Sequence, residues 1–155
     1  MSILSKRILA GVFLLAALAI GIGIYLWFKP HRNVQTETVF ARLSTSELID
    51  EFTADPARSN AKYLSDDGNS KVLIIKGKVS KISTNQIGET VILLKDDLSR
   101  VGISATFTQQ TNAHASGIKI GDIIGIKGAI TAGNRYDRDL DLYENATLIQ
   151  CDIAK

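Results

Sequence analysis

The chain divides into three regions that differ in the spacing of their apolar residues. Residues 8–28, ILAGVFLLAALAIGIGIYLWF, contain no charged side chain. Between residues 44 and 66, apolar residues recur at the three- to four-residue spacing of helices. From Lys71 onward they alternate with polar residues, as they do in strands. The pattern therefore predicts an apolar helix, a short helical region and a β domain.

The first region has the length of a membrane-spanning helix. A helix of 21 residues rises about 31 Å at about 1.5 Å per residue, close to the roughly 30 Å hydrocarbon core of a bilayer. Tyr25 and Trp27 lie near its C-terminal end, where aromatic rings favour the headgroup level, and the basic segment 29–32 ends it. We therefore expect residues 8–28 to cross the membrane once, with the lipid bilayer as a partner.

A cleaved signal peptide is the alternative interpretation of this region. Lys6 and Arg7 precede the apolar run, within a basic N-terminal tail at residues 1–7, and residues 17–19 resemble a cleavage site. However, the apolar run continues well beyond Ala19, whereas the core of a signal peptide is typically about 7–15 residues. An uncleaved anchor is favoured. The charges at both ends are nearly equal, and the start amine favours a cytoplasmic N-terminus with an extracytoplasmic C-terminal domain.

The second region carries two helix-start signals. Residues 29–43 are polar with scattered apolar residues and are predicted to form a juxtamembrane linker. Ser44 and Glu47 have the spacing of a capping box. Asp55 followed by Pro56 is typical of a second helix start. Residues 44–66 are therefore predicted to be short helices that pack on the domain that follows.

The third region, residues 71–155, predicts a mainly β domain. Five strands with a helical turn between the third and fourth match the five-stranded Greek-key barrel called the OB-fold. A sandwich or an SH3-like barrel has the same strand count and is the alternative. Gly77 interrupts the first strand, where a glycine commonly marks a bulge. The expected strands are residues 71–82, 90–95, 101–107, 122–132 and 139–151, with the helical turn within 108–117.

A series of short motifs between residues 44 and 152 points to one family. They are residues 46–49 with Phe52, residues 75–79, residues 91–94, and residues 120–128 with the sequence IGDIIGIKG. The series resembles the tRNA-anti-like family of membrane-anchored bacterial OB-fold proteins. The resemblance implies an OB barrel similar to anticodon-binding domains, an N-terminal anchor, and no defined activity. Many members carry a cysteine near position 105, where this chain has Ala105, so Cys151 is left alone.

Charge balance narrows the classes of function. The chain has 18 basic and 16 acidic residues, a net charge of +2. Lys6 and Arg7 are the only charged residues among the first 28, so the remainder is neutral. Neutrality argues against a polybasic nucleic-acid or membrane-surface protein, and a single cysteine argues against a disulfide scaffold.

No motif predicts catalysis, a cofactor or a metal. Asp137, Asp139 and Asp141 form a D-x-D-x-D run, but Leu142 stands where an EF-hand needs glycine. A hairpin rim with outward carboxylates explains the run better. His31 and His114 have no ligand-type neighbours at the spacing of a zinc site, so both are expected to be solvated.

The candidate ligand-binding residues are basic and aromatic side chains of the barrel. Single-strand binders combine aromatic platforms with a basic groove, and this domain has few aromatics and nearly balanced charge. The chain is therefore predicted to be a noncatalytic module that binds an envelope protein, peptide or oligosaccharide. Single-stranded, tRNA-like nucleic acid is the disfavoured alternative. The candidate residues are Lys76, Lys78, Lys127, Arg135 and Tyr136.

Overall fold

The structure is a computed structural model that describes residues 3–27 and 32–154. Within the N-terminal helix, the side chains of residues 3–10, 14, 26 and 27 lie outside the description. The chain forms two compact units, Met1–Arg32 and Asn33–Lys155. Each unit is described by itself.

The first unit is built around helix α1, Ile3–Trp27. Its conformation confirms a helix over most of the predicted residues 8–28, although Phe28 falls outside the described residues. The helix begins within the basic tail expected at residues 1–7. Among the described residues, no helix has both the length and the apolarity needed to cross a bilayer. The predicted membrane crossing is therefore not confirmed.

Residues 33–40, which we call the strap, belong to the second unit and pack against its strands instead of forming the linker expected at 29–43. Val34 is only 1% exposed and forms a small apolar cluster with Val72 and Ala129. The amide of Phe40 donates to the Val72 carbonyl at 2.8 Å. The strap continues into strand β1, Ala41–Ser44. The linker prediction is wrong here because a single buried valine in a polar segment leaves no periodic pattern.

Helices α2 (Thr45–Ala54) and α3 (Pro56–Tyr63) begin where the sequence predicts. The Ser44 amide donates to the Glu47 carboxylate at 2.6 Å, and the Glu47 amide donates to Ser44 Oγ at 3.2 Å. The hydrogen bond that the Ser44 amide donates to the Glu47 carboxylate holds the pKa of Glu47 below its ordinary value. Asp55 Oδ1 accepts from the Arg58 amide at 3.0 Å and caps α3. Both predicted caps are confirmed.

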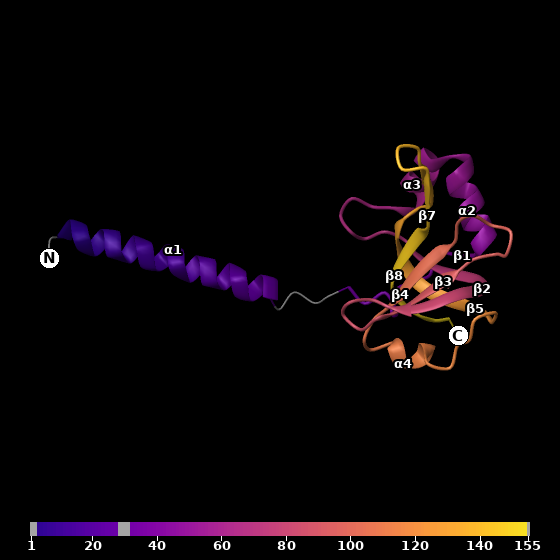
Figure 1. Ribbon diagram of the computed structural model, residues 1–155. Coiled ribbons are helices and arrows are strands. Elements are labelled where there is room, and N and C mark those ends of the chain that lie inside the picture. The colour runs from indigo at the N-terminus through magenta and orange to yellow at the C-terminus, as the bar shows by residue number, and fades with distance from the viewer. Residues whose placement is uncertain (1–2, 28–31, 155) are drawn as a thin grey trace. The chain divides into compact units, whose positions relative to one another are not determined.

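A closed barrel forms the body of the second unit, with α2 and α3 at one end and α4 at the other (Figure 1). The strand order is β2–β3–β4–β8–β5, and β5 pairs with β2 to close the ring. Only the β4–β8 pairing within this ring is parallel. Strand β1 adds to β2 in parallel. This confirms the five-stranded OB-like barrel. Its elements are β2 (Val72–Thr84), β3 (Thr90–Leu94), β4 (Ile103–Phe107), α4 (Asn112–Ala115), β5 (Ile123–Ala132) and β8 (Ala146–Ile153).

Gly77 of β2 allows a close approach of helix α2 and does not mark the bulge. The irregularity in the β2–β3 pairing falls later, between Val79 and Lys81. A Cβ atom at Gly77 would overlap Thr45 Oγ1, whose hydroxyl donates to the Lys76 carbonyl at 3.4 Å. Since Thr45 is 1% exposed, the absence of a side chain at position 77 lets the helix sit on the barrel.

The fifth predicted strand, residues 139–151, is divided in the structure. Strands β6 (Arg135–Asp137) and β7 (Leu142–Glu144) form a separate hairpin between β5 and β8. Asp137 Oδ1 accepts from the amides of Asp139 at 2.9 Å and Leu140 at 3.2 Å. Asp141 adopts a positive φ of 48°. The acidic run is thus the turn of this hairpin, and the Asp137 carboxylate stabilises the turn by accepting from the backbone that follows it.

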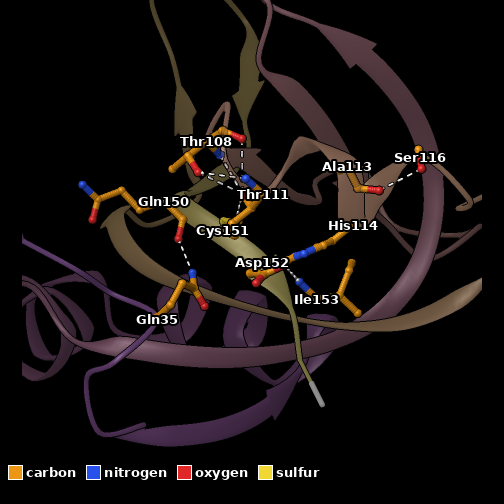
Figure 2. A network of polar contacts seen from close by, with 10 residues as sticks. All are labelled: Gln35, Thr108, Thr111, Ala113, His114, Ser116, Gln150, Cys151, Asp152 and Ile153. Atoms are coloured by element: carbon orange, nitrogen blue, oxygen red, sulfur yellow. Dashed lines mark hydrogen bonds and ion pairs between the residues drawn. The ribbon is translucent and has the colours of Figure 1, made fainter.

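Polar contacts tie the last strand to two distant segments (Figure 2). Gln35 Nε2 of the strap donates to the Gln150 carbonyl at 2.6 Å, and Thr111 Oγ1 donates to the Cys151 carbonyl at 2.7 Å. His114 Nδ1 lies 2.7 Å from Asp152 Oδ1. The His114 side chain is 58% exposed, as expected of a solvated histidine, and tertiary packing adds a carboxylate partner that its sequence neighbours do not provide. His31 lies outside the described residues. Cys151 is buried as expected, and burial raises the pKa of its thiol.

Candidate ligand-binding surfaces

The five predicted binding residues lie on two different surfaces. Lys76 and Lys78 belong to β2 and Lys127 to β5, whereas Arg135 and Tyr136 belong to the β6–β7 hairpin. The structure therefore does not gather the five residues into one site.

Lys78 and Arg135 are engaged in exposed ion pairs. Lys78 Nζ lies 2.7 Å from the Asp97 carboxylate. Arg135 pairs with Glu144 across the hairpin, with Nη2 to Oε1 at 3.1 Å. The hydrogen bond from Arg135 lowers the pKa of Glu144. Exposed ion pairs contribute only about 0–1 kcal/mol to stability, but an anionic ligand would have to compete with these carboxylates.

Lys127 fastens the strap to the barrel. Its Nζ donates to the carbonyls of Gln35 and Glu37, each at 2.8 Å. Two of the three ammonium hydrogens are thus used inside the protein. The lysine positions the strap, and its capacity for a further ligand is small.

A shallow groove runs along the outer face of β1, β2 and β5, and we call it the outer groove. Its first cavity, about 470 Å³, is lined by Arg42, Lys76 and Glu47 among others. A second cavity of about 380 Å³ shares Arg42 and includes Lys127 and Asp152. Arg42 was missed because its segment was predicted to be a linker. Cations and carboxylates alternate along the groove, so it has little preference for anions.

The hairpin carries a pair of exposed aromatic rings. Tyr136 and Tyr143 are cross-strand partners, their ring centroids lie 4.6 Å apart, and the planes are tilted by 38°. They are 45% and 41% exposed. Arg100 lies 5.5 Å from the Tyr143 ring centroid, and its Nη1 donates to the Tyr143 hydroxyl at 3.3 Å. We call these three residues the tyrosine platform.

Tyr136 is hydrogen-bonded to a carboxylate of the hairpin turn. Its hydroxyl donates to Asp141, and this hydrogen bond raises the pKa of the phenol. A phosphate near the platform therefore meets the Asp141 carboxylate as well as the guanidinium of Arg100.

The platform occupies a loop position that OB-folds use for ligands. The hairpin joins β5 to β8, which correspond to the fourth and fifth barrel strands. That loop and the loop between the first two strands commonly bind oligonucleotides and oligosaccharides. In this chain the loop between the first two barrel strands is residues 85–89, and its Ile87 is 64% exposed.

Tyr143 and Arg100 were missed by sequence reasoning. The segments RYD at 135–137 and LYE at 142–144 are symmetrical about the acidic turn, which is the signal that could have paired the two tyrosines. Arg100 had no such signal, since it lies 43 positions away from Tyr143. In the described parts of the chain, no three His, Cys, Asp or Glu side chains are grouped to hold a metal ion.

A closed five-stranded barrel with an aromatic surface on its β5–β8 connection defines an OB-fold binding domain. The chain belongs to the tRNA_anti-like family, whose family model matches residues 1–137. This confirms the resemblance inferred from the motifs.

One of the solved structures that share the fold illustrates the similarity. It is the crystal structure of a "putative nucleic acid-binding lipoprotein" from Klebsiella pneumoniae subsp. pneumoniae MGH 78578. The two are 17% identical, the TM-score is 0.53, and the alignment covers 73% of this chain and 91% of that one. At this identity the similarity shows the fold alone. No curated protein matches the chain.

Proposed function

We propose that the second unit is a noncatalytic domain that binds single-stranded nucleic acid, with bases stacked on the tyrosine platform. The observation that carries this proposal is the exposed Tyr136–Tyr143 ring pair beside Arg100. Every base has a flat π-face, and stacking on an aromatic side chain contributes about 1–3 kcal/mol per base.

Two further observations support nucleic acid over the envelope protein or peptide expected from the sequence. The platform combines aromatic faces with a guanidinium group, which suits a base and its neighbouring phosphate. The structurally similar Klebsiella protein is also described as nucleic acid-binding. The near neutrality of the domain then implies few phosphate contacts and a binding energy dominated by stacking.

Fluorescence titration of the full chain with single-stranded DNA and RNA tests the proposal. We expect micromolar binding with a weak salt dependence. Arg138 is an exposed residue in the turn between β6 and β7. If Arg100 and Arg138 each contact one phosphate, log K against log salt has a slope of about −1.4, since each contact on a single strand contributes about −0.7. Arg100→Gln then reduces the slope to about −0.7. Lys119→Gln, an exposed lysine on the β4–β5 connection, is the matched control. Absence of binding at low salt would sink the proposal.

We further propose that the first unit attaches the protein to a membrane. The apolar side chains of α1 support this, since Phe13, Leu15 and Tyr25 are 78%, 67% and 70% exposed. A run of such residues is costly in water. The finer expectation is a single crossing with the N-terminus in the cytoplasm and the barrel outside it.

Alkaline carbonate extraction of cell membranes tests this attachment. The intact chain should remain in the membrane fraction, and release into the supernatant would contradict the proposal. Protease treatment of intact spheroplasts then reports the side on which the barrel lies. N-terminal sequencing of the mature protein distinguishes an anchor from a cleaved signal peptide.

A further inference from the structure

A cavity lies between the helical end of the barrel and the β6–β7 hairpin. Its volume is about 620 Å³, within the roughly 300–1,000 Å³ range of small-molecule sites. It lies where α2 and α3 meet the end of β5 and the start of β8. Residues that line it include Phe52, Asn60, Leu64, Thr131, Asn134 and Thr147.

The hairpin separates this cavity from the tyrosine platform. Arg135 and Glu144 line the cavity, and Tyr136 and Tyr143 are the next residues along the two strands. Because neighbouring residues of a strand point to opposite faces, the ion pair and the rings lie on opposite faces of the hairpin. The cavity is therefore a separate site.

Asn134 brings an unsatisfied acceptor to the cavity wall. This residue is 8% exposed, and its Nδ2 donates to Thr53 Oγ1 at 3.0 Å. Thr53 Oγ1 itself donates to the Ile49 carbonyl at 2.8 Å, so it has no proton to return. Asn134 Oδ1 is buried with no hydrogen-bond partner among the described residues. A buried acceptor of this kind destabilises the fold as long as it lacks a donor.

The lining also has uncharged polar groups that are exposed. Asn60 contributes an amide that can both donate and accept hydrogen bonds. The Thr131 hydroxyl donates to the Thr147 carbonyl at 3.3 Å, so its oxygen is left as an acceptor. The only charged groups in the lining, Arg135 and Glu144, neutralise each other. A ligand with a net charge therefore finds no uncompensated counter-charge here.

One wall of the cavity is apolar and held in place. Phe52, Pro56 and Leu64 supply this wall. The Phe52 ring packs directly on Gly133, where an added Cβ would overlap the ring. The contact fixes the chain immediately before Asn134, so the wall and the acceptor keep a defined relative position.

We propose that this cavity binds a neutral saccharide unit. Sugar hydroxyls form hydrogen bonds with the exposed Asn60 amide and the Thr131 hydroxyl, and the C–H face of the ring packs on the apolar wall. A purely apolar ligand would leave these polar groups without partners, and a phosphate would meet the carboxylate of Glu144. This site is independent of nucleic-acid binding by the tyrosine platform.

The test is an NMR titration of the full chain, labelled with ¹⁵N and held in dodecylphosphocholine micelles, a detergent without a sugar group. The probes are maltotriose and N,N′-diacetylchitobiose at millimolar concentrations. We expect saturable shifts of the amide resonances of Asn60, Thr131 and Asn134. The resonances of Tyr136 and Tyr143 should not move.

Substitutions at exposed positions separate binding from folding. Asn60→Ala and Thr131→Val each remove one neutral hydrogen bond and should weaken binding about three- to tenfold. Ala132→Trp fills the cavity from an exposed position and should abolish the shifts. Gln110→Ala, an exposed residue at the α4 end of the barrel, is the matched control and should bind as the parent does.

Three results would overturn the proposal. They are no saturable shift with either saccharide, shifts that persist in Ala132→Trp, and shifts at the same residues with cytidine monophosphate in place of the saccharides. The last result would make the cavity a nucleotide site. Failure of the platform to bind oligonucleotides leaves all these outcomes unchanged, so the two proposals fail separately.

Discussion

Two pairs of aromatic rings in this domain have similar spacing and opposite surroundings. At the junction of α2, α3 and the barrel, the rings of Phe52 and Tyr63 lie 5.8 Å apart and are 1% and 0% exposed. On the β6–β7 hairpin, the rings of Tyr136 and Tyr143 lie 4.6 Å apart and are 45% and 41% exposed.

The difference shows that burial determines whether an aromatic pair stabilises the fold or is available to a ligand. The enclosed pair removes its whole apolar surface from water and therefore contributes to the free energy of unfolding. The exposed pair leaves ring surface for a ligand, and its removal should affect binding more than folding. The tyrosines of the hairpin are also bridged to polar groups, Arg100 and Asp141, that keep them oriented.

Removing the enclosed ring should have the largest effect on stability. Phe52→Ala leaves a cavity in the core and should lower the free energy of unfolding by about 3–5 kcal/mol. Tyr143→Ala, on the exposed pair, should change it by no more than about 0.5 kcal/mol. Urea denaturation followed by circular dichroism measures both. Equal losses in the two variants would contradict the comparison.

The close contact between α2 and β2 should be the next most sensitive feature. Gly77→Ala forces a methyl group onto Thr45 Oγ1 and should cost about 1–3 kcal/mol of unfolding free energy. Thr45→Ala removes that oxygen, so the double variant should lose less than the sum of the two single losses. Gly117→Ala, where the added methyl meets open space, is the control. Additive losses would show that the overlap is relieved elsewhere.

Substitution of either hairpin tyrosine should weaken nucleic-acid binding. Tyr136→Ala and Tyr143→Ala should each cost about 1–3 kcal/mol of binding free energy, because each removes a stacking surface. Fluorescence anisotropy with a labelled single-stranded oligonucleotide measures the change. Phe40→Ala removes an aromatic side chain of the strap, which is 49% exposed, and should leave the affinity unaltered. An equal loss in this control would remove the platform from the binding site.

The smallest predicted effect is on acid stability in the turn before β2. Hydrogen bonds from Ser65 and then from Asn69 lower the pKa of Asp67 from 3.8 to about 2. The folded state thus favours the carboxylate, and the associated stability is present above pH 3.8 and is lost as the pH falls toward 2.

Asp67→Asn should therefore lose less stability than the parent when the pH falls through this window. Urea midpoints measured across the window check the difference. Ser65→Ala removes the first of the donors and should raise the Asp67 pKa in a carboxyl NMR titration. An unchanged pKa in that variant would exclude the Ser65 hydrogen bond as the main cause.

Local signals in the sequence predicted the helices, the barrel and the family. The caps at Ser44 and Asp55 each depend on a side chain that accepts from the amide three residues later. Short sequence motifs were therefore enough to predict where the two helices begin. Alternating apolar residues placed the first four barrel strands, because each strand needs one buried face. The five candidate binding residues were identified only by type. The structure places Lys76 and Lys127 in the outer groove, Lys78 in an ion pair with Asp97, and the other two on the hairpin.

Tertiary structure alone decided which side chains meet and which remain available. Val34 is buried in the folded chain, so the segment predicted to be a linker forms a strap. Lys127 holds that strap through hydrogen bonds, and His114 lies beside Asp152. Asn134, which lines the cavity below the hairpin, has an Oδ1 atom without a hydrogen-bond partner among the described residues. Contacts such as that between Gln35 and Gln150 join residues 115 positions apart. A sequence pattern records the period of each segment, whereas such contacts depend on how the closed barrel brings distant segments together.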